Sequence, residues 1–158
     1  MSEYKATILW QRGDQKFSDL RFSRGHRWIL DGLEVPASAS PHVVRLPMSV
    51  AEAIDPEEAL VASLSSCHML TFLYLAAKRG FVIDEYRDEA VGVLAKNAEG
   101  RLAITLVTLH PAIRFADGTP VPTVADLEAL HHQAHEECFI SQSVKSEVRV
   151  EPVAVGNA

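Results

Sequence analysis

The chain has 158 residues, 47% of them hydrophobic and 23% charged, which is the composition of a soluble globular protein with a sizeable core. Its formal charge of -6 and pI near 5.6 argue against nucleic acid as a partner, because lysine and arginine are scattered and form no basic stripe. We find no internal repeat, low-complexity tract or linker, so we expect one domain over residues 1–158.

The first residues, MSEYKATILW, lack the basic segment, apolar segment and small-residue cleavage site of a secretory signal, so we expect a cytoplasmic protein. From Tyr4 to Leu30, aromatic and β-branched residues predict strands, with a turn at QRGDQK and a further strand from Phe17 onward. Residues 31–49 contain three prolines and many small residues, which predicts a long loop, a kind of segment that is often functional.

Asp55 begins a long predicted helix, with Asp55 as N-cap, Pro56 at the first helical position and two glutamates beside the positive end of the dipole. We expect this helix to end near Arg79, with Gly80 as the stop. Residues 59–77 within it are uncharged and long enough to span a membrane. Their several polar side chains favour the buried centre of a soluble domain, so we expect no membrane association.

Further along, two strands are predicted around the turn NAEG, which forms a hairpin. Thr123 is the predicted N-cap of a second helix that runs to Cys138, and the alternating residues 144–153 predict a final strand. The order of strands, long helix, hairpin, second helix and strand predicts an α+β fold.

Cys67 lies midway along the first predicted helix, where a cysteine is by default a small buried apolar residue. Nucleophilic chemistry would require the thiolate, and the helix dipole fades within the first turn, so a cation would have to come from elsewhere in the fold. His68 is a weak candidate, because it is adjacent in sequence but about 100° away around the helix.

The second cysteine lies in HHQAHEECFISQS, residues 131–143, a segment rich in metal-ligand side chains. His131 and His135 are spaced i, i+4 and could chelate zinc together with Cys138, since imidazole and thiolate suit that metal. Neither HExxH nor CxxC is present, and a complete site would need a further ligand. A zinc site and a helix that merely contains histidines both remain open.

Taken together, the two cysteine neighbourhoods resemble the OsmC/Ohr family of thiol-dependent hydroperoxide reductases. DPEEALVASLSSCHM, residues 55–69, is similar to the family's Asn/Asp-Pro-Glu-Glu/Gln-Leu start, followed by small residues and a cysteine. HEECFISQSVKSEV, residues 135–148, is similar to its A-H-x-x-C pattern, followed by a polar run and a strand. The resemblance covers residues 4–152 and implies an OsmC-like fold, with antiparallel N-terminal strands and an intertwined homodimer whose active site lies at the subunit boundary.

The resemblance also implies a mechanism. Cys67 would be the peroxidatic cysteine, which attacks the O–O bond and becomes a sulfenic acid, and Cys138 would resolve it as an intramolecular disulfide. A dihydrolipoyl group or other dithiol would then reduce the disulfide, and no bound cofactor is expected. An arginine from the N-terminal strands would hold the thiolate, oriented by Glu57, because a guanidinium is always charged and grips carboxylates bidentately. Arg24 is our choice for that arginine.

Arg21 and Arg27 are the rivals of Arg24. His68 stands where many relatives carry an apolar residue, and the loop before the helix is longer and richer in proline. These departures are typical of an OsmC-like subgroup, whose substrate preference the resemblance does not supply.

The leading hypothesis is therefore an antioxidant oxidoreductase that reduces organic hydroperoxides, and potentially hydrogen peroxide, under oxidative stress. Two alternatives remain. One is a non-catalytic binding or structural domain on the same fold, and the other is a zinc protein using His131, His135 and Cys138.

Overall fold

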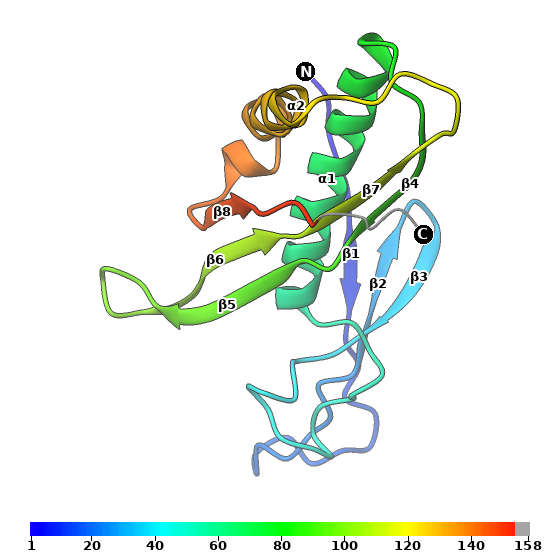
Figure 1. Cartoon of the computed structure of the whole chain (residues 1–158). Coiled ribbons are helices and arrows are strands. Elements are labelled where there is room, and N and C mark those ends of the chain that lie inside the picture. The colour runs from blue at the N-terminus through cyan, green and yellow to red at the C-terminus, as the bar shows by residue number, and fades with distance from the viewer. Residues whose placement is uncertain (154–158) are drawn as a thin grey trace. The chain divides into compact units, whose positions relative to one another are not determined.

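The computed structural model describes residues 1–153 (Figure 1). Contacts along the chain fall into two compact units, the first comprising Met1–Ala59 and the second beginning at Leu60. The expectation of one domain over residues 1–158 stays a prediction.

The first unit is built on a three-stranded antiparallel sheet in the order β1-β2-β3. Its strands are β1 (Thr7–Leu9), β2 (His26–Leu30) and β3 (Leu33–Ala37). Strand β3 corrects the expectation of an uninterrupted loop over residues 31–49. Asp31 and Gly32 have φ values of 51° and 86° and form the two-residue turn between β2 and β3. Pro36 is tolerated in β3 because this strand lies at the edge of the sheet.

The segment between β1 and β2 is not a strand, which corrects the expectation of strand structure from Phe17 onward. The rings of Phe17 and Phe22 stack with centroids 4.4 Å apart. Trp10 packs against both rings, at 5.9 Å from Phe17 and 5.5 Å from Phe22. The aromatic residues that suggested a strand therefore form a side-chain cluster within a loop.

Helix α1 (Pro56–Lys78) begins and ends as predicted. The Asp55 carboxylate accepts a hydrogen bond from the Glu58 backbone N–H at 2.8 Å, and the Glu58 carboxylate accepts from the Asp55 N–H at 3.3 Å. This reciprocal arrangement is a capping box. Gly80, with φ of 81°, ends the helix in the left-handed conformation that glycine adopts without steric cost.

By length and composition α1 could cross a membrane, a property that the core helix of a soluble protein also has. Five of its side chains are buried, namely Leu64, His68, Phe72, Leu75 and Ala76. They recur at helical spacing, which gives α1 one face directed into the core.

The second unit contains two small sheets. In one, β4 (Ile83–Asp88) pairs antiparallel with β7 (Pro111–Phe115). In the other, the order is β5-β6-β8, with β8 parallel to β6. Its strands are β5 (Val91–Lys96), β6 (Leu102–Leu109) and β8 (Glu147–Val150).

The hairpin expected at NAEG joins β5 and β6, but each of the two long strands predicted around it is divided in two. The break coincides with Asp88, whose carboxylate accepts from the His110 backbone N–H at 2.6 Å and from the Ser65 hydroxyl at 2.5 Å. The Asp88 carboxylate thus replaces the backbone acceptor that the His110 N–H would have in a continuous sheet, and the two sheets separate at this point.

Helix α2 (Val124–Glu137) is capped by Thr123, as predicted, in a capping box with Asp126. Cys138 is its C-cap, and the short 3-10 helix η1 (Ser141–Ser143) leads on toward β8. Figure 1 shows α2 almost end-on beside α1. One core cluster joins the two helices through Phe72, Leu75, Ala76, Leu130 and Ala134. The predicted α+β class is confirmed by this arrangement of helices and strands.

Candidate functional site

The two cysteines lie together in the second unit. The thiol of Cys67 on α1 lies beside the thiol of Cys138 at the end of α2, close enough for Cys138 to raise the pKa of Cys67, and both are free thiols. Cys138 is fully buried, whereas Cys67 is half-buried. Of the pair, Cys67 is therefore the sulfur that a molecule from solution can reach first.

The segment that follows α2 surrounds both sulfurs with backbone donors. The backbone N–H groups of Ile140 and Phe139 lie close enough to the Cys67 sulfur to act on its pKa, and the Ser141 N–H donates to Cys138 Sγ at 3.4 Å. Cys138 makes this possible because its extended conformation, with ψ of 111°, ends the helix and turns the chain around the sulfurs. Sequence reasoning missed these groups, since no residue type marks a backbone donor.

These surroundings favour the protonated form of Cys67. Burial raises the pKa of the Cys67 thiol, and so does the neighbouring Cys138 thiol, while the backbone N–H groups of Ile140 and Phe139 act in the opposite direction. The net shift is upward. Nucleophilic chemistry requires the thiolate, so it requires a cation in addition to these groups.

Arg24, the arginine chosen from the sequence, lies in the first unit just before β2. Its guanidinium lies 3.8 Å above the ring of Phe22 and donates to the carbonyl oxygens of Phe22 and, at 3.0 Å, of Leu20. Over residues 1–153, no carboxylate forms an ion pair with Arg24, and the structure does not bring it to Glu57. The guanidinium is held by an aromatic ring and by backbone oxygens.

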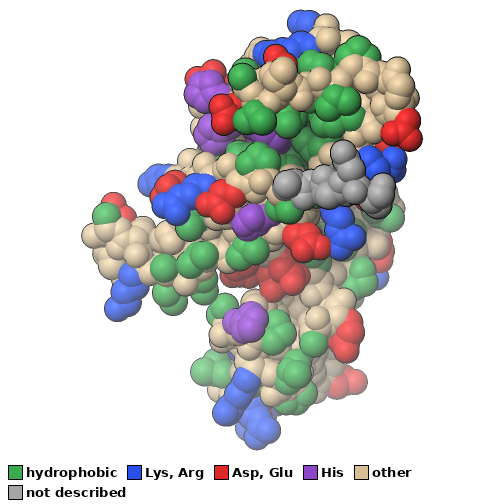
Figure 2. All heavy atoms as spheres, in the orientation of Figure 1, with side chains coloured by type: hydrophobic (Ala, Val, Ile, Leu, Met, Phe, Trp, Pro, Cys, Tyr) green, Lys and Arg blue, Asp and Glu red, His purple; other side chains and the backbone are tan. Residues whose placement is uncertain are grey.

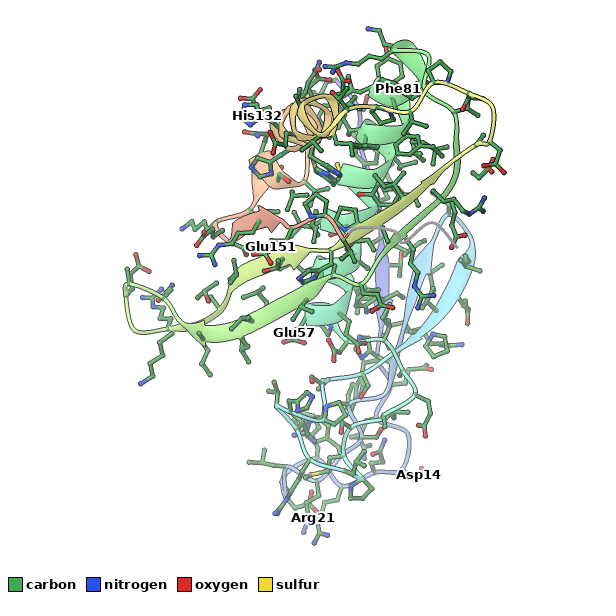
Figure 3. The ribbon with its side chains drawn as sticks, viewed as in Figure 1. Asp14, Arg21, Glu57, Phe81, His132 and Glu151 are labelled. Atoms are coloured by element: carbon green, nitrogen blue, oxygen red, sulfur yellow. The ribbon has the colours of Figure 1, made fainter. Side chains whose placement is uncertain are left out.

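The rival arginines have other surroundings, and Glu57 has an unused acceptor. Arg27 pairs with Glu34 at 3.2 Å on the exposed side of the sheet, and Arg21 lies in the loop between β1 and β2 (Figure 3). Glu57 lies at the start of α1, and its Oε2 is buried with no hydrogen-bond partner among the described residues (Figure 3). A buried carboxylate oxygen without a donor is costly, so Glu57 is suited to receive a guanidinium.

A pair of buried histidines joins the two helices that carry the cysteines. Nε2 of His68 and Nδ1 of His131 are 3.1 Å apart, and the two residues are 0% and 5% exposed. Their rings are nearly parallel, and His131 also packs on Phe72 with ring centroids 4.4 Å apart. Burial lowers the pKa of His68 and of His131 to about 4, so both imidazoles are neutral near pH 7.

This pairing gives His131 a different role from the zinc ligand considered from the sequence, because its Nδ1 is occupied by His68. Between residues 1 and 153, no group of three or more histidine, cysteine, aspartate and glutamate side chains is arranged to hold a metal ion. The structure thus does not assemble His131, His135 and Cys138 into a ligand set. His132 projects from the side of α2 away from α1 and lies 3.4 Å from Glu136 (Figure 3).

An apolar groove borders the pair of thiols. The residues that line it are Leu70, Thr71, Tyr74, Glu136, Glu137, Phe139 and Gln142. Thr71 lies one helical turn beyond Cys67 and donates its hydroxyl hydrogen to the Cys67 carbonyl oxygen at 2.9 Å, which places the groove beside that cysteine. Figure 2 shows histidine and acidic side chains next to one another over the α2 side of this unit.

Comparison with known proteins adds to this geometry. Residues 49–153 match the OsmC-like protein family. The structure of an OsmC-like protein of unknown function from Vibrio cholerae is similar, with 50% sequence identity, a TM-score of 0.94, and coverage of 97% of this chain and 100% of that one. No curated protein matches the sequence.

Two organic hydroperoxide resistance proteins have the same fold. That of Elizabethkingia anophelis is 18% identical with a TM-score of 0.69, and the comparison covers 99% of this chain and 98% of that one. That of Bacillus subtilis is 18% identical with a TM-score of 0.62, and 98% of each chain is covered. At this identity the likeness shows the fold alone.

Proposed function

Because the chain belongs to the OsmC-like protein family, we propose that it is a thiol-dependent peroxidase that reduces organic hydroperoxides. Cys67 is the peroxidatic cysteine and Cys138 the resolving cysteine. The observation that carries this proposal is the closeness of the two thiols, which lie on α1 and at the end of α2. Relatives that are organic hydroperoxide resistance proteins support the class of substrate.

The chemistry proceeds in three steps. The Cys67 thiolate attacks the outer oxygen of the hydroperoxide, the O–O bond breaks, and the alkoxide leaves as an alcohol after taking up a proton. Cys67 is thereby oxidised by two electrons to a sulfenic acid. The sulfur of Cys138 then attacks that of Cys67, an S–S bond replaces the S–O bond, and water leaves. An external dithiol reduces the disulfide by exchange and is itself oxidised.

Arg24 and Glu57 complete the proposed site. Burial raises the pKa of Cys67, so the thiolate needs a cation, and a guanidinium supplies a permanent one. Glu57 supports this assignment because its buried Oε2 lacks a donor among residues 1–153. We assign Arg24 to the thiolate and Glu57 to the orientation of Arg24.

The surroundings of Cys67 support an organic substrate and a second subunit. Leu70, Tyr74 and Phe139, which line the groove, are 61%, 60% and 79% exposed, and such a cluster of large apolar side chains is suited to an alkyl or aryl group. The exposed apolar residues of α1 also support a homodimer in which this helix is covered. A cytoplasmic location and a dihydrolipoyl or other dithiol reductant belong to the same proposal.

The proposal is tested by following consumption of tert-butyl or cumene hydroperoxide in the presence of a dithiol. We expect turnover by the native chain and none by Cys67→Ser. In a separate reaction without the dithiol, Cys138→Ser should consume one equivalent and stop at a sulfenic acid, which dimedone traps. Consumption by Cys67→Ser at the native rate would contradict the proposal.

The upward pKa shift of Cys67 favours a second candidate, a non-catalytic binding domain on the same fold. In that case the native chain would consume hydroperoxide no faster than an equal concentration of free cysteine. Turnover measurements on the native chain therefore separate the two functions directly.

A further inference from the structure

Two buried imidazoles that take no part in the chemistry proposed above connect α1 to α2. His68 directly follows Cys67, and His131 lies about two helical turns before Cys138. The hydrogen bond between Nε2 of His68 and Nδ1 of His131, at 3.1 Å, thus links the two helices close to both sulfurs.

Other contacts between these helices do not fix their relative position as closely. The shared core of Phe72, Leu75, Leu130 and neighbouring alanines is apolar, and apolar burial is not directional. Arg79, just past the end of α1, donates to Gln133 at 3.1 Å, but this bond is exposed. Within residues 1–153, the histidine pair is the buried side-chain hydrogen bond that joins α1 to α2.

Within the part of the chain that the structure describes, the histidine pair leaves buried nitrogens without hydrogen-bond partners, which is unfavourable in a packed core. A neutral imidazole has one donor and one acceptor nitrogen, so the shared bond uses one nitrogen of each ring. The outer nitrogens, Nδ1 of His68 and Nε2 of His131, are buried and lack a partner among the described residues. Each such group is destabilising because it has lost its hydrogen bond to water, whereas two leucines at these positions would avoid that cost. What the histidines provide is a directional link.

Disulfide formation depends on such a link. The S–S bond is only about 2.05 Å long and requires a narrow range of Cα separations and dihedral angles, so a small slide of α2 along α1 would prevent it. Cys138 is fully buried and cannot reach Cys67 by swinging through solvent. Whether the Cys138 sulfur comes within bonding distance of the Cys67 sulfur therefore depends on the position of the C-terminal end of α2.

We propose that the hydrogen bond between His68 and His131 is a positioning device that sets the Cys138 thiol against Cys67. It governs the disulfide step and leaves the first reaction of Cys67 unaffected. The physiological meaning of this step rests on the proposed peroxidase function, but the positioning can be measured without a hydroperoxide.

The measurement uses the aromatic disulfide dithiobis-nitrobenzoate in stopped flow. The Cys67 thiolate displaces one thionitrobenzoate and forms a mixed disulfide, and the Cys138 thiolate then attacks the Cys67 sulfur and displaces the second. Two phases of thionitrobenzoate release therefore report the two steps separately. Cys138→Ser identifies the first phase, because it can release only one equivalent.

We expect His131→Leu, which keeps the apolar volume, to slow the second phase by about tenfold or more, the effect of one lost buried hydrogen bond, with little change in the first. His131→Asn should restore the second phase to within about threefold of native, because its amide occupies the position of Nδ1. His132→Leu, on the exposed side of α2, is the matched control and should leave both phases unchanged.

An equal second phase in native protein and His131→Leu would overturn the proposal. If His131→Leu fails to fold, His68→Leu and the rescue variant His68→Gln are judged by the same criterion. A native chain with a fast second phase but no hydroperoxide consumption would remove the peroxidase function and leave the positioning role intact. Hydroperoxide consumption by the native chain, together with a native second-phase rate in the leucine variants, would keep the peroxidase function and remove the positioning role.

Discussion

The thiol of Cys67, midway along α1, lies beside the buried thiol of Cys138, which ends α2. Two sulfurs so placed can be joined after only a small local movement. Their unequal exposure also orders their reactions, because the half-buried Cys67 meets a reagent before Cys138 does. Burial, together with the neighbouring Cys138 thiol, raises the pKa of the Cys67 thiol, which makes an additional cation necessary for reactivity.

Replacement of that cation should slow the reactions of Cys67. We expect Arg24→Ala to lower the rate of alkylation by iodoacetamide near neutral pH by about tenfold, since each unit of thiol pKa changes the thiolate fraction tenfold. The alkylation rate of Arg24→Lys should lie between those of the native chain and Arg24→Ala, because an ammonium keeps the charge but not the bidentate geometry. If Arg21→Ala or Arg27→Ala has this effect instead, Arg24 is the wrong arginine.

Stability should decrease in mild acid because of the buried histidine pair. His68 and His131 have pKa values of about 4 in the folded chain, below the ordinary 6.5 that they have when unfolded. Between these values the unfolded chain binds protons that the folded chain does not, so the free energy of unfolding falls as pH drops from 6.5 toward 4. Above pH 6.5, the histidine pair makes its full contribution to the free energy of unfolding.

Urea unfolding at a series of pH values measures this dependence. Each unit by which folding lowers a histidine pKa corresponds to about 1.4 kcal/mol in the free energy of unfolding. The groups that face the pair also titrate or carry charge. Asp88 raises the pKa of His68, and His135 lowers it. The double variant His68→Leu/His131→Leu should lose the acid slope, and retention of the native slope would assign it to other groups.

Gly92 on β5 should tolerate no larger residue, because α1 passes too close. A Cβ at this position would lie 2.5 Å from Cγ2 of Val61. Gly92→Ala should therefore reduce the free energy of unfolding by about 1–3 kcal/mol, the usual effect of overpacking. Since Val61→Ala makes room, the double variant should be more stable than the sum of the single effects predicts, by about 0.5 kcal/mol or more. Additive effects in thermal or urea unfolding would contradict this contact.

The helices were predictable because their signals are local. Asp55 and Pro56 mark the start of α1 and Gly80 its end, all within a few residues of the backbone groups they affect. Thr123 and Asp126 do the same for α2. Such caps act on neighbouring peptide groups whatever the rest of the fold does.

Strand boundaries depended on partners that the sequence does not reveal. Asp88 divides the long hairpin because its carboxylate binds the backbone of His110, which lies far along the chain. The turn at Asp31 and Gly32, by contrast, was a readable hairpin signal that the prolines around it obscured. The aromatic cluster of Trp10, Phe17 and Phe22 imitated a strand pattern within a loop.

The candidate site was reached from the sequence through family resemblance, which identified Cys67 and Cys138 together. Their mutual contact, the backbone donors at Phe139 and Ile140, and the histidine pair arise from the packing of α2 on α1. His68 was set aside because it points away from Cys67. In the structure, the same direction places the His68 side chain against His131.

The claim that Cys67 and Cys138 form a redox pair is tested most directly by mass spectrometry of the protein before and after one equivalent of tert-butyl hydroperoxide. The expected product has lost two hydrogens and, after proteolysis without reductant, yields one pair of peptides joined through Cys67 and Cys138. Two unmodified thiols, or oxidation that stops on one cysteine without forming the cross-link, would contradict the claim.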